Sequence, residues 1–400
     1  MVAAGQFDGN LLTAMSAAAK LLDPSARAFS TSNPDALAAW GRADYERAAA
    51  LDPDFGTAWL AWTESLAAAG EVPRAIEVAA RALDRPALRS EYDRAQIEFV
   101  SAGLRKDEPA RKNALASLVR LTHDTSLMGA LAELETNARR YAAAADLYRN
   151  ILRLEPDNAP AMNSLGYAEA FAGNLEPARR AFEDYRKQPG QEPNALDSLG
   201  EAHFMNGRFK DAEKYFLQAH ERDAAFLAGA DLLKAAYAHW LGGDLNGADG
   251  LMRQYLQFRG NLRDPLLAWR EAVWLYSTGR REQATAKLES APASEAQVAV
   301  RQLNVWRGAT SASGVYALLL QKKFVEAVPE LKQAYEHTQP AADGQLRTFY
   351  AWALYETGRK DEARQLLTRW PLPESTGDPL FGSLVYPRFI ELRRLLSPAS

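Results

Sequence analysis

The sequence predicts an all-α solenoid of antiparallel helix pairs, and three observations support this fold class. Alanine recurs along most of the chain at an interval that suits one helix hairpin. Glycine and large apolar residues keep fixed distances from these alanines. The 400 residues are 47% apolar and include no cysteine, which indicates a buried core held without disulfides.

The repeat register is clearest at one alanine per repeat, here called the reference alanine. Successive reference alanines are 34 to 36 residues apart, except for one interval of 43 residues. Several repeats also carry a glycine five residues before the reference alanine and a large apolar residue four residues after it. The reference alanines are Ala75, Ala110, Ala144, Ala178, Ala212, Ala248, Ala284, Ala327 and Ala363, and the glycines are Gly70, Gly173, Gly207, Gly243, Gly279 and Gly358.

Each repeat has the pattern of two amphipathic helices joined by a short turn. In residues 192–219, Leu196, Leu199 and Gly200 fall on one helical face, and Gly207 can end that helix in a left-handed cap. The small side chain at Gly200 lets the two helices approach, so a larger residue there would overpack the contact. The pattern therefore predicts helix pairs whose apolar faces are covered by the neighbouring pairs.

Some segments depart from this pattern. Residues 10–22 predict one amphipathic helix before a polar linker, and residues 34–51 predict a single helix rather than a pair. Residues 90–122 lack the turn glycine, so that pair is predicted from spacing alone. In the long interval, residues 294–306 predict a helix, which either is supernumerary or marks a break in the register.

The arrangement resembles the tetratricopeptide repeat, which combines an aromatic, Leu-Gly, Ala, Phe and Pro in that order. Residues 51–53 and 154–156 match the Leu-Asp-Pro ending usual in that family. The resemblance implies a right-handed superhelical solenoid of about eight to nine helix pairs over residues 34–370. Residues 1–33 are then an N-terminal helix and linker, and residues 371–400 are a capping segment. The matching residues are Trp59, Ala75, Ala82, Pro86, Leu165, Gly166, Ala178, Phe182, Leu199, Gly200, Ala212, Phe216 and Ala219.

The two ends carry a second resemblance. Residues 31–37 and 378–392 are similar to the segments that open and close tetratricopeptide regions of bacterial serine/threonine kinases and transcriptional regulators. This resemblance implies a regulatory or sensory region of a bacterial signalling protein whose output domain lies elsewhere. Phe381, Phe389 and Leu392 are expected to cover the last apolar face.

Composition restricts the partners. With 47 basic against 51 acidic residues, the net charge is −4, which disfavours nucleic acid as a partner. No apolar run is long enough to cross a membrane and the first residues lack a signal-peptide pattern, so we expect a soluble protein, in the cytoplasm rather than the periplasm. We expect a monomer or a weak homodimer.

No group of residues forms a convincing catalytic, metal or cofactor site. The five histidines lack the helical spacing of a metal site, and the glycine pairs belong to turns rather than phosphate loops. His203 and His239 occupy the same repeat position and are interpreted as packing residues rather than as a shared metal site. We therefore expect neither enzymatic activity nor a cofactor.

A partner would bind where the first helices of the pairs line a concave groove, an arrangement that the family resemblance implies. The residues there either pack between helices or grip an extended peptide or a helix, with aromatic anchors and orienting charges. The Lys and Asn clamp that chaperone-type members use for terminal carboxylates is absent as a set, and Asn163 alone does not make it. The residues at its positions are Leu60, Ala61, Glu64, Asn163 and Asp197. The candidate peptide-binding residues are Asn163, Tyr167, Asp197, Glu201, Lys234, Tyr237, Trp240, Arg270, Tyr276, Tyr316 and Trp352.

Overall fold

The computed structural model describes residues 31–86, 88, 90–306, 311–337, 344–368, 388 and 391–396. All regular structure in these ranges is helical. The chain divides into two compact units, Met1–Arg139 and Arg140–Ser400, called here the N-terminal and C-terminal units. The predicted all-α fold of helix pairs is confirmed, while the predicted helix at residues 10–22 and the roles of Phe381 and Phe389 lie outside the described residues.

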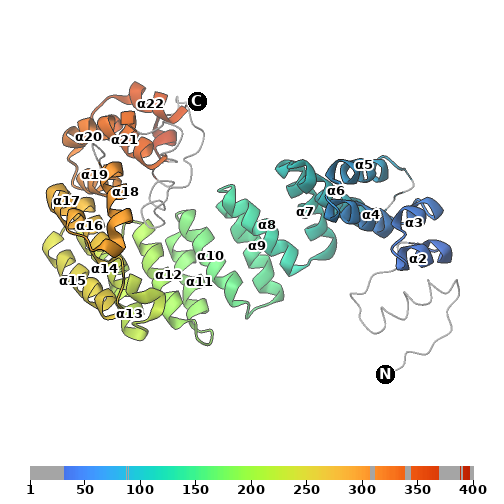
Figure 1. Ribbon diagram of the computed structural model, residues 1–400, viewed down its shortest axis with the longest axis horizontal. Coiled ribbons are helices and arrows are strands. Elements are labelled where there is room, and N and C mark those ends of the chain that lie inside the picture. Colours follow the sequence, from blue (N-terminus) through green and yellow to red (C-terminus); the bar gives the residue numbers. More distant parts are fainter. Residues whose placement is uncertain are drawn as a thin grey trace. The chain divides into compact units, whose positions relative to one another are not determined.

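In the N-terminal unit, helices that follow one another in the chain pack as neighbours (Figure 1). The predicted single helix over residues 34–51 is wrong, because a turn at Ala43, whose φ is +61°, divides it and Asp44 caps the second part. The helices are α2 (Pro34–Gly41), α3 (Tyr45–Leu51), α4 (Gly56–Ala68), α5 (Val72–Leu83), α6 (Glu91–Arg105), α7 (Glu108–Thr122) and α8 (Thr125–Asn137).

The C-terminal unit is itself a stack of antiparallel pairs, shown from green to red in Figure 1. Its helices are α9 (Tyr141–Leu154), α10 (Ala159–Phe171), α11 (Leu175–Arg186), α12 (Glu192–Met205), α13 (Phe209–Arg222), α14 (Ala230–Leu241), α15 (Leu245–Asn261), α16 (Leu267–Ser277), α17 (Arg281–Glu289), α18 (Ala296–Trp306), α19 (Ala312–Leu320), α20 (Phe324–His337), α21 (Gly344–Glu356) and α22 (Lys360–Thr368). Short 3₁₀ turns, η1 (Phe226–Gly229) and η2 (Ala293–Glu295), precede α14 and α18.

Helix ends follow from local side-chain chemistry. Side chains such as Asn33, Ser90 and Asp124 accept hydrogen bonds from the first N–H groups of their helices. The six predicted turn glycines all have positive φ, from +71° at Gly207 to +107° at Gly243. Repeats without a glycine place another residue in the left-handed region, as at Arg139 and Lys322.

Buried apolar residues form several separate clusters along the chain rather than one central core. Every reference alanine except Ala110 is 0% exposed, because the two helices of its pair meet there. In the α12/α13 pair, Gly200 lies against the ring of Phe216, as predicted from the small residue at that position. Near the end of the described chain, Leu392 and Leu396 are buried in the same apolar cluster as Leu367 of α22.

The long interval in the register holds one extra helix. Helix α18 follows the α16/α17 pair and contacts α17, while α19 of the next pair contacts α16. The predicted helix at residues 294–306 is therefore present and is supernumerary, since the pairing of helices resumes after it.

Candidate functional site

The predicted groove residues lie in the C-terminal unit and fall into three groups. An ionic cluster joins α10, α12 and α14. An aromatic group follows on α14 and α16. Two further aromatic residues, Tyr316 and Trp352, lie on α19 and α21, and Arg270 lies near the start of α16.

The ionic cluster is built around Lys234. Asp197 and Glu201 stand one turn apart on α12, so both carboxylates face the same side of that helix. The Lys234 ammonium on α14 lies 2.6 and 2.8 Å from the two Asp197 oxygens and 2.6 Å from a Glu201 oxygen. Lys234 is thus bound within the protein and does not point into solvent to orient a peptide.

Two neighbours from α10 complete the hydrogen bonds of this cluster. The Tyr167 hydroxyl donates to Glu201 at 2.6 Å and lies 3.1 Å from the Ser198 hydroxyl. Ser198 in turn donates to the amide oxygen of Asn163 at 3.2 Å. Burial, followed by the negative charge of Glu201, raises the pKa of Tyr167 well above its usual value, so this hydroxyl stays a donor.

Asp231 is a fully buried carboxyl beside the cluster. Neither of its oxygens has a hydrogen-bond donor among the described residues while it is a carboxylate. Burial and then the charge of Asp197 raise the pKa of Asp231 to about 8. A protonated Asp231 can donate to Asp197, so the two carboxyls share one proton at neutral pH.

The aromatic group packs tightly. The Tyr237 ring meets Trp274 edge to face with centroids 5.2 Å apart and lies 6.2 Å from Trp240, while the Tyr237 hydroxyl donates to Ser277 at 3.4 Å. Trp240 is 8% exposed and Tyr276 is 9% exposed. These side chains pack between helices, yet Trp240 and Tyr276 each keep an edge on a hollow.

This hollow, called here the aromatic hollow, has a volume of about 490 Å³. Its floor is apolar and aromatic, and its rim carries Arg281, Gln321 and Glu330. The lining residues are Trp240, Gly243, Leu245, Tyr276, Thr278, Gly279, Arg281, Ser311, Gly314, Val315, Ala317, Leu318, Gln321 and Glu330.

The hollow lies where α16 and α19 meet, after the extra helix α18 in the chain. Helix α19 meets the end of α16 at Gly314, where a Cβ atom would lie 3.0 Å from the Ser277 carbonyl oxygen. Farther along α19, Leu318 and Gln321 line the hollow and leave the edges of Trp240 and Tyr276 uncovered.

The remaining predicted residues are not brought to this hollow. Arg270 is tied to the buried Asp264 at 2.5 Å, together with Arg259. Tyr316 stacks on Phe349 with centroids 4.8 Å apart, and burial raises the pKa of Tyr316 to about 12.

Trp352 is covered by the Arg388 guanidinium, which lies 3.8 Å from the ring centroid. Trp352 is 6% exposed, and its indole N–H donates to Glu356 at 3.1 Å. This aromatic residue therefore belongs to the internal packing of α21.

Both repeat-related histidines also have local partners. His203 is 9% exposed and packs on Tyr215, and burial lowers the pKa of His203. His239 is hydrogen bonded to Glu213 at 2.8 Å and to Asp244 at 3.0 Å. Within the ranges that the structure describes, no group of three or more His, Asp or Glu side chains could hold a metal ion.

Several important residues were missed by the sequence analysis. Asp231 looks like an ordinary acidic residue in the first turn of a helix, and nothing in the sequence marks Ser198 as a partner of Tyr167 and Asn163. A usable signal exists for the ionic cluster, because Asp197 and Lys234 lie about one repeat apart on first helices and carry opposite charges. The sequence offers no comparable signal for Arg281 and Glu330.

Family comparisons agree with the helix pairs. Sequence models of the tetratricopeptide repeat match residues 130–193, 169–226 and 318–385, so the chain contains tetratricopeptide repeats. The TPR repeat-containing protein PA4667 of Pseudomonas aeruginosa is 28% identical over 174 residues, which cover 42% of this chain and 29% of that protein. The chain thus matches less than a third of that relative's length.

Solved structures with similar helix arrangements include three tetratricopeptide and related proteins. YrrB, described as a TPR protein with an unusual peptide-binding site, covers 46% of this chain and 94% of its own, with 15% identity and a TM-score of 0.37. A tetratricopeptide repeat protein from Parabacteroides merdae covers 76% and 98%, with 12% identity and a TM-score of 0.41. Yeast Tom70 covers 90% and 87%, with 12% identity and a TM-score of 0.36.

None of the helices in the described part of the chain is long and apolar enough to cross a membrane.

Proposed function

We propose that this chain is a non-enzymatic scaffold that binds a peptide or protein segment at the aromatic hollow. Tetratricopeptide repeats form scaffolds for protein–protein interaction, and their presence in the chain supports a binding role. The observation that carries the proposal is the hollow itself, where two predicted groove residues, Trp240 and Tyr276, keep exposed edges beside polar groups.

The chemistry of the hollow suits a peptide. Its volume of about 490 Å³ is enough for one or two side chains, and the aromatic floor favours an apolar anchor. Arg281 and Glu330 give the rim one charge of each sign, so they can orient a segment that carries charges beside its anchor. The proposed site keeps Trp240 and Tyr276 from the predicted set and adds Arg281, Gln321 and Glu330.

The ionic cluster supports this role without touching the ligand. It fixes α14 to α12 through Lys234, and α14 carries Trp240 into the floor of the hollow. Rigid placement of the anchoring ring lowers the entropy lost on binding.

A selection from a random heptapeptide library on the immobilised full chain tests the proposal. The affinity of a recovered peptide is then measured by fluorescence anisotropy with the wild type, with Arg281→Ala and with Gln321→Trp, which places a bulky side chain at the rim. We expect each substitution to weaken binding about tenfold or more. Circular dichroism should show unchanged helix content, because both positions lie on the rim of the hollow.

Arg301→Ala is the matched control, because Arg301 is exposed on α18 and does not line the hollow. It should leave the affinity unchanged. A peptide that binds all four proteins equally, or a library that yields no binder, would exclude the aromatic hollow as the binding site.

A regulatory role in a bacterial signalling protein is the second candidate, and it rests on the resemblance of the two ends to such regions. Thr31 donates to Asp52, and Asn33 caps α2 while its amide donates to the Leu51 carbonyl at 3.1 Å. The segment thus connects the start of α2 with the end of α3 through hydrogen bonds. Sequencing the gene on both sides of this region would reveal a kinase or DNA-binding domain in the same reading frame, and its absence would remove this candidate.

A further inference from the structure

His203 and His239 occupy the same repeat position but have opposite surroundings. Both stand nine residues before their reference alanine, near the ends of α12 and α14. The ring nitrogens of His203 have no hydrogen-bond partner in the described part of the chain, whereas both ring nitrogens of His239 face carboxylates. The two repeats therefore allow a comparison in which the histidine stays the same and its neighbours change.

The neighbours that change stand at two repeat positions. One lies one residue after the preceding reference alanine, and the other lies four residues before the reference alanine of the histidine's own repeat. Both positions carry a carboxylate around His239 and an arginine around His203. These residues are Glu213 and Asp244 in the first case, and Arg179 and Arg208 in the second. The charge at both positions is thus reversed between the two repeats.

His239 joins α13 to the start of α15 through its two ring nitrogens. Nδ1 lies 2.8 Å from a Glu213 oxygen, and Nε2 lies 3.0 Å from an oxygen of Asp244, the residue that caps α15. A neutral imidazole carries one N–H, so it can donate to one carboxylate while a lone pair faces the other. An imidazolium carries two N–H groups and donates to both. The hydrogen bonds are therefore complete only when His239 is protonated.

The electrostatic surroundings of His239 agree with this geometry. Burial by itself would lower the pKa of His239, but the hydrogen bonds and charges of Asp244 and Glu213 outweigh burial and raise the pKa above its usual value. Glu213 faces the ring from α13 and Asp244 from the start of α15, and no cation opposes them. The folded chain thus favours the imidazolium at this position.

The surroundings of His203 favour the neutral ring. Burial lowers the pKa of His203, and the positive charges of Arg208 and Arg179 add to this effect. Asp211, which lies 3.7 Å from Nδ1, opposes it, as does Glu176. His203 is therefore a matched control for His239, because it has the same place in its repeat and the opposite charge state.

The close approach of His239 to α15 requires a residue without a side chain. A Cβ atom at Gly247 would overlap the Nε2 atom of His239. Glycine in a helix costs stability relative to alanine, and Gly247 lies in the first turn of α15. The corresponding position in the repeat of His203 holds Asp211. Gly247 thus makes room for the imidazole at a cost to its own helix.

Asp244 connects His239 to the aromatic hollow. One Asp244 oxygen bonds His239, and the other accepts a backbone N–H of α15 at 3.0 Å. Gly243 and Leu245, on either side of Asp244, line the hollow. Trp240, the residue after His239, lines it as well. The turn between α14 and α15, which His239 holds to α13, therefore forms part of the wall of the hollow.

We propose that His239 is a proton-dependent switch on the wall of the aromatic hollow. With its proton bound, His239 holds the α14–α15 turn to α13 through Glu213 and Asp244. Loss of the proton removes one of the two hydrogen bonds and frees the turn to move. Acidic pH therefore favours the arrangement in which the hollow binds its ligand, a step that rests on the function proposed above.

NMR of the full chain with ¹³C-labelled histidine rings measures the protonation of each histidine between pH 5 and pH 9. Substituting each of the five histidines by Gln assigns the signals. We expect a titration midpoint above the usual value for His239 and below it for His203. Glu213→Gln should lower the midpoint of His239, because a neutral amide no longer favours the imidazolium. Arg179→Gln, the corresponding substitution beside His203, should leave the midpoint of His239 unchanged.

Hydrogen exchange over residues 242–248 tests the switch without a ligand. Protection factors, which correct for the pH dependence of intrinsic exchange, should fall about threefold or more in the wild type between pH 6 and pH 8.5. They should be low at both pH values in His239→Gln. His203→Gln should keep the wild-type fall. Asp231→Asn should keep it too, which separates His239 from the other proton-binding group of α14.

Binding of a heptapeptide selected on the chain, acetylated and free of histidine, connects the switch to the hollow. Its affinity should fall about threefold or more from pH 6 to pH 8.5 in the wild type and in His203→Gln, but not in His239→Gln. An affinity that stays constant while protection falls would overturn control of the hollow by His239.

Two results would overturn the switch itself, namely a His239 midpoint below the usual value and an equal fall in protection in His239→Gln and the wild type. A library that yields no binder would count against the function proposed for the hollow. The two failures are distinguishable, because the midpoints and the protection factors are measured without a ligand.

Discussion

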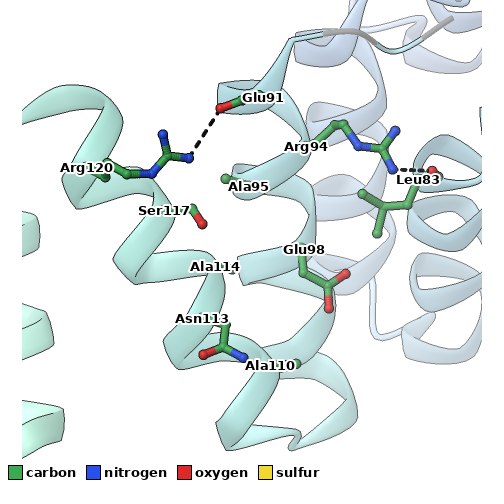
Figure 2. A pocket seen from close by; sticks show the side chains of 10 residues that line it. All are labelled: Leu83, Glu91, Arg94, Ala95, Glu98, Ala110, Asn113, Ala114, Ser117 and Arg120. Carbon is green, nitrogen blue, oxygen red and sulfur yellow. Dashed lines mark hydrogen bonds and ion pairs between the residues drawn. The ribbon is translucent and has the colours of Figure 1, made fainter. Parts of the chain in front are cut away.

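The helix pairs α6/α7 and α12/α13 fill corresponding positions with opposite kinds of residue. In α12/α13, Gly200 is covered by the ring of Phe216, and Leu196 is 2% exposed. In α6/α7 the corresponding positions hold Glu98, Ala114 and Arg94, which line a hollow of about 570 Å³ (Figure 2). Corresponding repeat positions thus hold residues of different size and charge, and the two helix pairs pack differently as a result.

Phe216→Ala should have the largest effect, because it gives α12/α13 the small residue that α6/α7 already has. Phe216 is 0% exposed, and its loss should lower the local free energy of unfolding by about 3–5 kcal/mol. Hydrogen exchange followed by mass spectrometry over α12, α13 and α14 measures this, because repeats open locally.

The exposed Lys214 on the same helix provides the control, and Lys214→Ala should change local stability by less than about 0.5 kcal/mol. Equal loss of protection in all described helices after Phe216→Ala would contradict local opening. If Phe216→Ala caused no loss of hydrogen-exchange protection, α12/α13 would tolerate a small residue at this position as α6/α7 does.

Two glycine substitutions, one in each helix pair, are expected to change the free energy of unfolding in opposite directions. A Cβ atom at Gly200 would lie 2.5 Å from the Phe216 ring, so Gly200→Ala should destabilise by about 1–3 kcal/mol. At Gly103 on α6 the nearest atom would lie 3.8 Å away, so Gly103→Ala should stabilise by up to about 1 kcal/mol through helix propensity. Urea unfolding measures the change in the free energy of unfolding for each variant. If both variants were destabilised, or both stabilised, this account of the packing would be contradicted.

The helix pairs could be predicted because their signals are local. Turn glycines, reference alanines and apolar spacing lie within one repeat, and the structure keeps all of them. The division of residues 34–51 was missed because it depends on Asp44 capping α3 and on Ala43 adopting a positive φ, which its side chain does not favour.

The site was predicted less well because its interactions connect different repeats. Lys234 and Arg270 were read as orienting charges, yet Lys234 is held by carboxylates on α12 and Arg270 by Asp264. A pattern of groove positions shows which residues share a line, but it does not show which side chains have already satisfied one another. Of the predicted set, Trp240 and Tyr276 line the aromatic hollow.

The buried aspartates extend the comparison, because Asp93 and Asp231 occupy the same position before their reference alanines. Asp93 starts α6 and is 5% exposed, whereas Asp231 starts α14 and is 0% exposed, facing Asp197 and Glu201 of α12 and Lys234 of its own helix. A neutral Asn can replace a protonated Asp with little change in shape, so Asp231→Asn isolates the proton. Asp231→Asn should change stability little near pH 4, and its effect should grow as pH rises, because folding of the wild type then requires uptake of a proton that Asn does not need.

The sign of the pH effect follows from the raised pKa of Asp231, about 8 in the folded chain against about 4 when unfolded. Between these values the folded state binds one proton more, so the free energy of unfolding falls as pH rises and this contribution is lost above pH 8. Asp231→Asn should remove the fall and leave the variant more stable than the wild type at pH 9. Urea unfolding at pH 5, 7 and 9 measures both curves, and parallel curves would mean that Asp231 is ionised at neutral pH.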